Sequence, residues 1–224
     1  MLKSAKKIAV IGDIHGCINP LKDLYEKVLK YTDEVYSVGD LIDRGKNSKE
    51  VIQFCIDNKI SPVRGNHEDM LLKAIQSFDS DNKREFNMRL DNCLFNGGKA
   101  TYKSYIGKNT DFAKFCEVFR ICGHYDFISS LPVKLENEFC YITHAGIIKD
   151  ATETDLLWNR TEPPAKLNKF QIFGHTPIMK VEYVPGYFAN IDTGCFYTGK
   201  LSAAIISADD VKFITNRKNI SLGL

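Results

Sequence analysis

The sequence predicts an α/β (α+β) fold in which two mixed β-sheets pack together and are flanked by helices, with one helical excursion. Strand-like and helix-like segments alternate over residues 8–63, which is typical of βαβ units and a parallel sheet. Residues 77–131 lose the two-residue alternation of strands and contain helical patches. Short strand-like segments separated by turn residues fill residues 133–215, which indicates hairpins and hence a mixed or second sheet.

The composition is that of an ordinary globular protein. The 224 residues are 44% hydrophobic and 26% charged, with a formal net charge of +2, which argues against a disordered chain. Because the charge is small and the cations are dispersed, we expect no nucleic-acid partner. No apolar run reaches the roughly 18 residues of a membrane span, and the one after the basic start stops at Gly12. We therefore expect no membrane partner, no signal peptide and a cytoplasmic location, with the oligomeric state left open.

The number and spacing of the cysteines predict that they are reduced thiols rather than disulfides. There are seven, an odd number, and no Cys-x-x-Cys spacing occurs, so a disulfide framework or a thiolate metal site is not indicated.

The first 63 residues predict three strands and two helices. The strands are the apolar runs 8–11, 35–38 and 60–63. Asn19-Pro20 is a helix-start signal, a capping residue followed by proline at the first helical position, and the helix runs to Lys30. Ser48 is the expected cap of the second helix. A third helix is expected to begin near Asn66.

The remaining elements follow from the same patterns. In the excursion, helical patches at 85–95 and 111–122 are separated by Asn96-Gly97-Gly98. The strands expected after it are 133–135, 139–143, 170–173, 179–184, 187–191, 201–207 and 211–215.

Five of the expected strands are each followed by a short polar cassette that contains glycine. Open α/β sheets bind their ligands at such strand ends, and glycine lets the backbone turn sharply there. Four of the five histidines in the chain lie in these cassettes, and we expect the exception, His124, to be structural or at the surface. The cassettes are Gly12-Asp13-Ile14-His15-Gly16, Gly39-Asp40-Leu41-Ile42-Asp43-Arg44-Gly45, Gly65-Asn66-His67-Glu68, Thr143-His144-Ala145-Gly146 and Gly174-His175-Thr176.

The residue types in the cassettes predict a dinuclear metal site. Mixed imidazole, carboxylate and amide ligation without thiolate suits Mn, Fe or Zn. Two cations roughly 3.5–4 Å apart lower the pKa of a bridging water and clamp the oxygens of an in-line phosphoryl displacement. We therefore expect two divalent ions, Mn²⁺ first, with Fe or Zn as alternatives.

In this order, the five cassettes resemble the phosphoprotein phosphatase branch of the calcineurin-like metallophosphoesterases. Trp158-Asn159-Arg160, Asn96-Gly97-Gly98 and Ile191-Asp192-Thr193-Gly194 narrow the resemblance to short bacterial and phage Ser/Thr protein phosphatases of the bacteriophage-lambda type. The similarity covers residues 8–207. It implies the metallophosphoesterase fold and one catalytic domain over residues 1–224, with the excursion at about 77–131 as part of it.

The resemblance also implies a reaction, in which a metal-bridging hydroxide attacks phosphoserine or phosphothreonine in a protein or peptide, with phosphotyrosine left open. His67 is implied to protonate the leaving oxygen, with Asp43 holding its ring. The implied metal ligands are Asp13 and His15 for the first ion, Asp40 as the bridge, and Asn66, His144 and His175 for the second. The implied phosphate-binding residues are Arg44, Arg160 and Asn66.

Several residues near the cassettes have simpler alternatives. Arg44 and Asp43 could pair with each other as a surface ion pair. We expect Glu68 to favour a helix N-terminus electrostatically rather than to act as a base. Asp192 is either a partner of His175 or a turn residue. Packing is the expected role of Cys17 and Cys195.

Other phosphate chemistries lack their signatures. No cysteine is followed by arginine six positions later, and no Asp-x-Asp-x-Thr or nucleotide-binding Gly-Lys-Ser/Thr loop occurs. Within the resemblance, the alternative is a symmetrical bis(5'-nucleosyl)-tetraphosphate hydrolase or another small-molecule phosphoesterase. That hydrolase group has a non-acidic residue where this chain has Asp43, so Asp43 and Asn159-Arg160 favour the protein phosphatase. A catalytically silent binding module is a second alternative, although every ligand position is filled.

Overall fold

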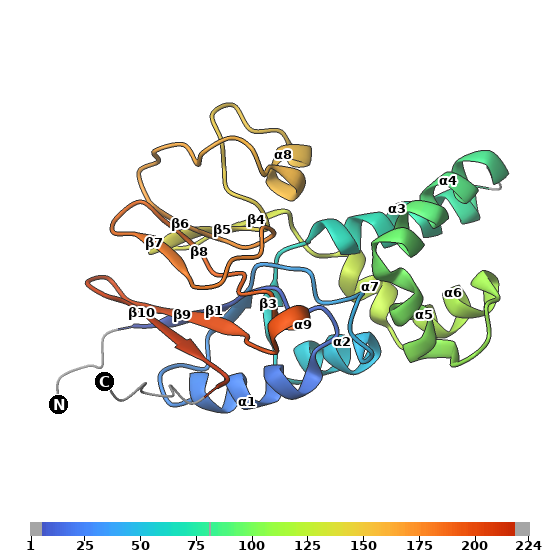
Figure 1. Cartoon of the computed structure of the whole chain (residues 1–224), viewed down its shortest axis with the longest axis horizontal. Helices are drawn as coiled ribbons and strands as arrows, with labels where there is room; N and C mark the ends of the chain where they lie inside the picture. Colours follow the sequence, from blue (N-terminus) through green and yellow to red (C-terminus); the bar gives the residue numbers. More distant parts are fainter. Residues whose placement is uncertain (1–5, 81, 218–224) are drawn as a thin grey trace.

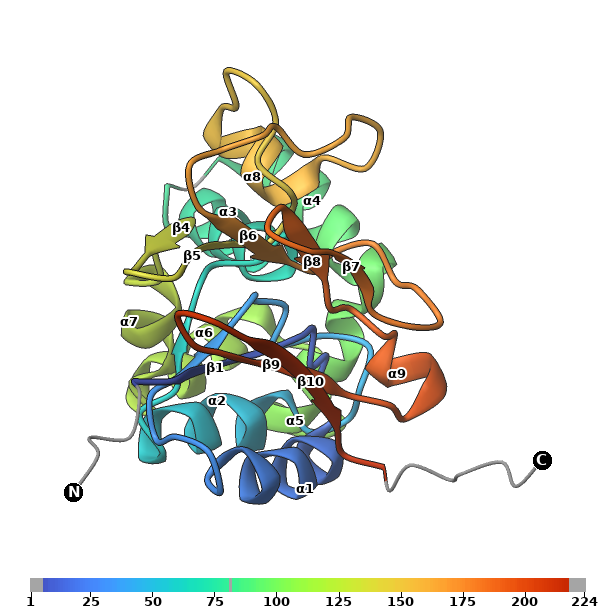
Figure 2. The ribbon, with the colours of Figure 1, turned by 90° about the vertical axis from the view of Figure 1, so that its left-hand side faces the viewer.

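The computed structural model describes residues 6–80 and 82–217. Two five-stranded mixed sheets lie face to face. Helices α1 (Ile18–Val28) and α2 (Ser48–Asp57) cover the outer side of one sheet, and the short helix α8 (Glu153–Trp158) lies over the other (Figure 1 and Figure 2). Every helix in these two stretches is too short or too polar to span a bilayer. The predicted fold class is confirmed.

The first sheet has the strand order β10-β9-β1-β2-β3. The three N-terminal strands are parallel, with Val10 opposite Tyr36, and β9 runs antiparallel to β1, with Ala204 opposite Val10. The last hairpin therefore joins the sheet of the first three strands rather than the second sheet. Its strands are β1 (Ile8–Ile11), β2 (Val35–Ser37), β3 (Ser61–Pro62), β9 (Ser202–Ile206) and β10 (Val211–Thr215).

The second sheet has the order β4-β5-β6-β8-β7. Its central strands β5, β6 and β8 are parallel to one another, and β4 and β7 are antiparallel edges. The carboxyl ends of β5 and β6 consequently lie at one edge. The strands are β4 (Lys134–Glu136), β5 (Cys140–Thr143), β6 (Phe170–Phe173), β7 (Glu182–Val184) and β8 (Phe188–Asn190).

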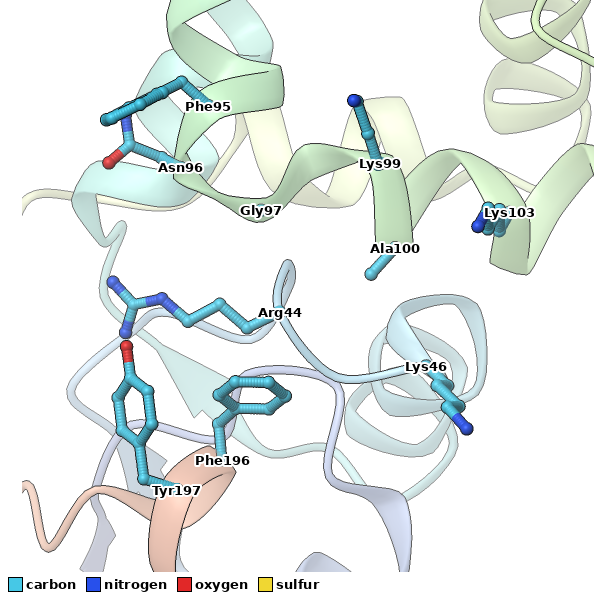
Figure 3. Close-up of a pocket in the computed structure, with 10 residues that line it drawn as sticks. All are labelled: Arg44, Lys46, Phe95, Asn96, Gly97, Lys99, Ala100, Lys103, Phe196 and Tyr197. Atoms are coloured by element: carbon cyan, nitrogen blue, oxygen red, sulfur yellow. The ribbon is translucent and has the colours of Figure 1, made fainter.

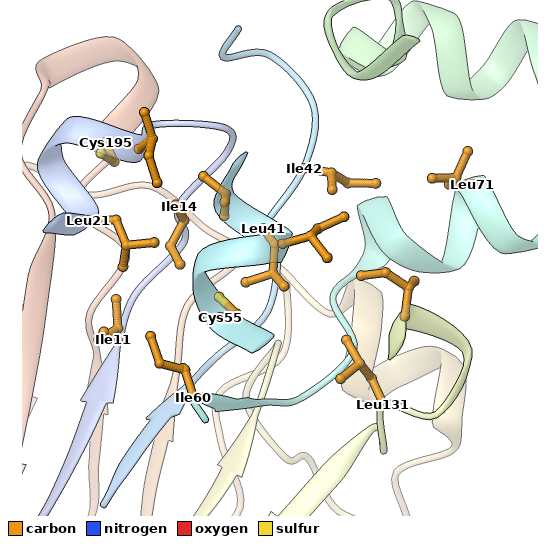
Figure 4. Close-up of a cluster of buried hydrophobic side chains, with 14 of the residues drawn as sticks. Ile11, Ile14, Leu21, Leu41, Ile42, Cys55, Ile60, Leu71, Leu131 and Cys195 are labelled. Carbon is orange, nitrogen blue, oxygen red and sulfur yellow. The ribbon is translucent and has the colours of Figure 1, made fainter. Parts of the chain in front are cut away.

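Alternate residues of β1 supply two hydrophobic cores. Ile8 and Val10 pack in the cluster between the sheets, while Ala9 and Ile11 belong to the cluster shared with the helices, as the two-residue period of a strand requires. Figure 4 shows Ile11 in the second cluster with Leu21 of α1. Each fully buried aliphatic side chain contributes about 1.5–3 kcal/mol to stability, so β1 is fixed from both faces.

The helical excursion lies at one end of the two-sheet body (Figure 1). It docks on the second cassette through Gly97, whose carbonyl accepts a hydrogen bond from the Arg44 N–H at 3.2 Å. Gly97 has φ 108°, and a Cβ there would lie 2.9 Å from the Arg44 nitrogen, so the approach requires glycine. The excursion follows α3 (Asn66–Asp79), and its elements are α4 (Lys83–Cys93), the kinked turn η1 (Leu94–Gly98), α5 (Lys99–Ile106), α6 (Phe112–Ile121) and α7 (His124–Ser129).

Two predicted helix caps are wrong. Helix α1 begins at Ile18, so Pro20 lies inside the first turn, where a missing N–H costs no intrahelical hydrogen bond. The residue before α2 is Asn47, and Ser48 is already helical. The Ser48 hydroxyl instead accepts a hydrogen bond from the Asp43 N–H at 3.1 Å. Because it makes this contact with the cassette, it does not cap the helix.

Candidate active site

Five strand ends from both sheets meet at one place. The cassettes follow β1, β2 and β3 of the first sheet and β5 and β6 of the second. Their polar side chains are almost entirely removed from solvent, each at most 3% exposed. Because an unpaired buried charge is costly, groups of this kind need partners or bound cations. The buried residues are Asp13, His15, Asp40, Asp43, Asn66, His67, His144 and His175.

Asp40 lies at the centre of this cluster. Its Oδ2 is 3.4 Å from His15 Nε2 and 3.8 Å from His67 Nε2, and its Oδ1 is 3.4 Å from His144 Nε2. Ligand atoms of His15, Asp40 and His67 lie within 4.8 Å of one another, as do those of Asp13, Asp40 and His144. A carboxylate shared by two such groups has the position of a bridge between two cations.

Backbone carbonyls orient the His15 and His144 rings so that the Nε2 lone pair of each faces Asp40. His15 Nδ1 lies 2.9 Å from the Ile42 carbonyl, and His144 Nδ1 lies 2.8 Å from the Val38 carbonyl. Since a carbonyl only accepts, Nδ1 carries the proton and Nε2 is the acceptor. Burial lowers the pKa of His15 to about 3 and also lowers the pKa of His144. Neutral rings oriented in this way are in the form that binds metal ions.

His144 Nε2 also faces two further lone-pair atoms. It lies 2.9 Å from Asn66 Oδ1 and 3.0 Å from His175 Nδ1. Burial lowers the pKa of His175 to about 2, which keeps its ring neutral too. This second group therefore combines amide, imidazole and carboxylate donors around one point.

The Asp13 and Asp40 carboxyl groups are buried among other ionisable groups. Burial, followed by the charges of Asp192 and Asp40, raises the pKa of Asp13 well above its usual range. Burial alone would also raise the pKa of Asp40, but the surrounding histidines outweigh it and lower that pKa. The donor types and the free imidazole lone pairs together fit two divalent cations.

Gly174 makes room for Asp13. A Cβ at Gly174 would lie 2.0 Å from Asp13 Oδ1, so no other residue is tolerated there. The next residue, His175, donates its backbone N–H to the Asp13 carboxylate at 3.2 Å. The glycine of the last cassette thus allows β6 to contact the cassette that follows β1.

The His67 ring is positioned by Asp43, and Asp43 is in turn positioned by Thr101. His67 Nδ1 lies 2.7 Å from Asp43 Oδ2, and the Thr101 hydroxyl donates to Asp43 Oδ1 at 2.5 Å. Burial lowers the pKa of His67, but the charges of Asp40 and Asp43 and the Asp43 hydrogen bond outweigh it, so the pKa is raised. Asp43 therefore holds Nδ1 of the ring and leaves Nε2 turned toward Asp40.

The two arginines lie on different sides of the cluster. Arg44 is half-buried, and its guanidinium nitrogens are 2.7 Å from His15 Nε2 and 3.0 Å from His67 Nε2. Among the described residues no ion pair joins Arg44 to Asp43, whose carboxylate binds His67 instead. Arg160 is exposed and lines a groove of about 370 Å³ that reaches Gly174.

Two positioning residues were missed by the sequence analysis. The buried Glu68 carboxylate accepts hydrogen bonds from the backbone N–H groups of Gly65, Asp40 and Leu41 at 2.8–2.9 Å. It does lie in the first turn of α3, as expected, but its main role is to fasten the second cassette to the third. A glutamate three residues after a helix cap signals the contact with the Gly65 N–H, but not the contacts with Asp40 and Leu41. Thr101 carries no local signal, because it belongs to the excursion.

The other neighbouring residues have packing or turn roles. Asp192 accepts a hydrogen bond from the Gly194 N–H at 2.8 Å, which is the turn alternative. Cys195 is buried in the helix-side core, and Cys17 packs against that core. His124 is fully buried and lies 2.5 Å from the Tyr105 hydroxyl, so it is structural.

The backbone is strained where the cassettes turn. Within the described stretches seven residues other than glycine have positive φ, and five of them belong to the cassettes. Left-handed backbone at non-glycine residues costs free energy and gathers at functional sites. The five are His15 (47°), Asp40 (50°), Asp43 (70°), Arg44 (63°) and His175 (71°).

Comparison with known proteins agrees with the resemblance seen in the sequence. Residues 6–214 match the profile of the calcineurin-like phosphoesterases. Serine/threonine-protein phosphatase 1 of Salmonella typhimurium is 30% identical over 220 residues, which cover 91% of this chain and 94% of that protein. The asymmetrical bis(5'-nucleosyl)-tetraphosphatase of Oceanobacillus iheyensis is 27% identical over 88% of this chain and 87% of its own.

A solved structure has the same fold. The protein serine/threonine phosphatase from Saccharomyces cerevisiae superposes with a TM-score of 0.61 at 18% identity, covering 95% of this chain and 80% of that chain. With the family profile spanning nearly the whole chain, the protein belongs to the calcineurin-like phosphoesterases.

Proposed function

We propose that this phosphoesterase is a protein phosphatase, a phosphomonoesterase that hydrolyses phosphoserine and phosphothreonine in proteins or peptides. The observation that carries the proposal is the 2.7 Å contact between His67 Nδ1 and Asp43, beside the Asp40 cluster. It supplies a supported general acid next to a site built for cations. The whole chain acts in this proposal as one catalytic domain, with the excursion contributing Thr101 behind the acid.

Members of the family use a dinuclear divalent metal site, and the donor set described above fits it. We assign Asp13 and His15 to one cation, with Asp40 shared. Mn²⁺ is the proposed metal on the donor types. When bound, two such cations lower the pKa of a water between them and neutralise charge on the phosphoryl group. The ligands assigned to the other cation are Asn66, His144 and His175.

The arginines are proposed to bind the phosphoryl oxygens. A guanidinium presents a planar fork of donors that matches a phosphate. The Nε2 lone pair of His15 lies 2.7 Å from the Arg44 guanidinium, and if His15 held a cation instead, the Arg44 donors would be available to substrate. Arg160 makes no hydrogen bond with the other described residues. A substrate could therefore bind its guanidinium without replacing an existing contact. The Asn66 amide nitrogen can donate to the same phosphate.

His67 is proposed to protonate the leaving oxygen of serine or threonine. An alkoxide is a poor leaving group, so a proton delivered in the transition state accelerates its departure. Asp43 keeps the proton-bearing ring in place and stabilises its charged form. Departure of a nucleotide needs far less protonation, because its phosphate oxygen is already a weak base. The His67–Asp43 pair therefore favours a phosphomonoester of an alcohol.

The second candidate function is hydrolysis of dinucleoside tetraphosphates. It is supported by relatives that carry this activity in their names, including the symmetrical enzyme of Haemophilus influenzae, 25% identical over 92% of this chain and 94% of its own. The same cation site would serve both reactions. The two candidates differ in the leaving group and in the groups that surround the phosphate.

Metal-stripped protein, assayed with and without Mn²⁺, separates the candidates. We expect Mn²⁺-dependent phosphate release from a phosphothreonine peptide and little cleavage of diadenosine tetraphosphate. The reverse preference would keep the cation site and move the substrate to nucleotides. No turnover of either substrate would contradict both candidates and indicate a silent binding module.

A further inference from the structure

A groove of about 730 Å³ opens beside Arg44, outside the cassettes (Figure 3). One wall is the end of η1 and the start of α5, and the other is the short helix α9 (Cys195–Thr198) with the loop after Arg44. Because Arg44 lies both in this groove and against His15 and His67, a substrate held by Arg44 would extend into it.

The groove is lined by cations and by no carboxylate. Lys46, Lys99 and Lys103 contribute exposed ammonium groups. Among the residues that the structure describes, none of the three lies within 4.0 Å of an Asp or Glu oxygen, whereas several other lysines are paired. With Arg44, four positively charged residues without a carboxylate partner among the described residues therefore line one hollow. Such a concentration of one sign attracts negatively charged ligands.

Exposed aromatic rings line the same groove. Phe95 is 91% exposed and Tyr197 is 67% exposed, and the Tyr197 ring centre lies 5.9 Å from the Arg44 guanidinium carbon. In Figure 3 these two rings lie toward the guanidinium, whereas Lys46 and Lys103 lie at the other end. Large exposed rings beside a polar hollow are typical of binding surfaces.

We propose that this groove binds acidic residues flanking the phosphorylated residue, so that the enzyme prefers acidic phosphopeptides. The inference rests on the proposed protein-phosphatase function. Lys99 and Lys103 are one helical turn apart and Lys46 lies on the opposite wall. Separated ammonium groups match carboxylates spaced along an extended chain, at about 3.3 Å per residue, better than one compact polyphosphate. The rings would cover the apolar parts of the peptide.

The test compares two double charge reversals on a matched set of substrates. Lys99→Glu/Lys103→Glu alters the groove, and Lys22→Glu/Lys30→Glu makes the same change in net charge on exposed lysines outside it. The substrates are phosphothreonine peptides that differ only in Asp or Asn at the flanking positions, diadenosine tetraphosphate, and p-nitrophenyl phosphate, which has no flanking carboxylate.

We expect the unaltered enzyme to prefer the Asp peptide, and the groove variant to lose about tenfold in kcat/KM on it, since each exposed ion pair is worth a factor of about two to five. Activity on p-nitrophenyl phosphate should stay within about twofold in both variants. The preference should shrink at about 0.5 M salt, where exposed charges are screened.

Equal hydrolysis of the Asp and Asn peptides by the unaltered enzyme would overturn the inference and leave the proposed function intact. An equal loss in the control variant, or a loss confined to diadenosine tetraphosphate, would also overturn it. Failure to hydrolyse either peptide, with turnover of p-nitrophenyl phosphate retained, would instead overturn the proposed function and the inference with it.

Discussion

In the proposed mechanism, His67 delivers the proton and Asp43 holds its ring. Asp43 accepts at Nδ1, so the other nitrogen of His67, which lies 3.8 Å from Asp40 Oδ2, is the one available to a leaving group. The ring is 1% exposed, and water therefore cannot easily replace it as the acid. A leaving group that needs no proton should be indifferent to its loss.

For His67→Ala we expect hydrolysis of a phosphothreonine peptide to slow by roughly 10²–10⁴, the usual worth of a general acid. The loss on p-nitrophenyl phosphate should be much smaller, because its phenolate departs without help. Steady-state kinetics on the two substrates, with metal content measured on the same sample, checks this. Equal losses on both substrates, with metal content unchanged, would rule out the acid role.

The residues that meet at the site were largely predictable because each follows a strand directly. Asp13, Asp40 and His144 are adjacent to apolar runs, so their position depends only on which strands are parallel. Thr101 and Glu68 were missed for a different reason. Their partners lie 58 and 28 residues away in the sequence, and nothing in a local pattern reports such a contact.

The start of α3 depends on Glu68. Removing its carboxylate would leave the buried N–H groups of Gly65, Asp40 and Leu41 without acceptors, each at a cost of about 1–3 kcal/mol. We expect Glu68→Ala to lower the free energy of unfolding by at least about 3 kcal/mol, measured by urea denaturation. The exposed Glu26→Ala on α1 is the control and should stay within about 0.5 kcal/mol. Similar stabilities for the two variants would contradict this role.

Helix α5 reaches the site through Thr101. Replacement by Val keeps the shape but removes the hydroxyl that contacts the Asp43 carboxylate and its N–H. We expect kcat on a phosphothreonine peptide to fall about tenfold, a fraction of the roughly 10²–10⁴ that a general acid contributes, with little change in KM or in activity on p-nitrophenyl phosphate. Thr101→Ser should restore the rate. A change in KM alone would show that the excursion affects binding rather than the acid.

Element boundaries were least predictable where a contact with a distant part of the chain determines them. Ser48 has the composition of a cap, yet its hydroxyl serves Asp43. Asn96-Gly97-Gly98 does break the helix, as predicted, because Gly97 has non-helical backbone (φ 108°, ψ 5°) and marks a kink between α4 and α5. The positive φ of Gly97 is set by its contact with Arg44, not by the local sequence.

The buried His124 links the excursion to helix α2. Its Nδ1 contacts Tyr105 and its Nε2 lies 3.1 Å from Gln53 Oε1 on α2. Burial lowers the pKa of His124 from 6.5 to about 4. Between these values the unfolded chain binds a proton that the folded chain does not, so stability falls as the pH falls from about 6.5 to about 4.

At about 1.4 kcal/mol per pKa unit, this contribution amounts to at most about 3 kcal/mol. His124→Gln cannot titrate, so its unfolding free energy should depend less on pH across that window. Urea denaturation of both proteins at several pH values between 4 and 7.5 gives the difference directly. Parallel pH profiles for the two proteins would contradict the assignment.

The proposed reaction depends on Asp40 joining two cation sites. Protein incubated with excess Mn²⁺, desalted and analysed for metal by mass spectrometry should carry two ions per chain, as a bridged pair requires. Asp40→Asn, measured alongside a circular dichroism check of its fold, should carry fewer than one and lose phosphatase activity with them. One ion or none in the unaltered protein, or two retained in folded Asp40→Asn, would contradict the account.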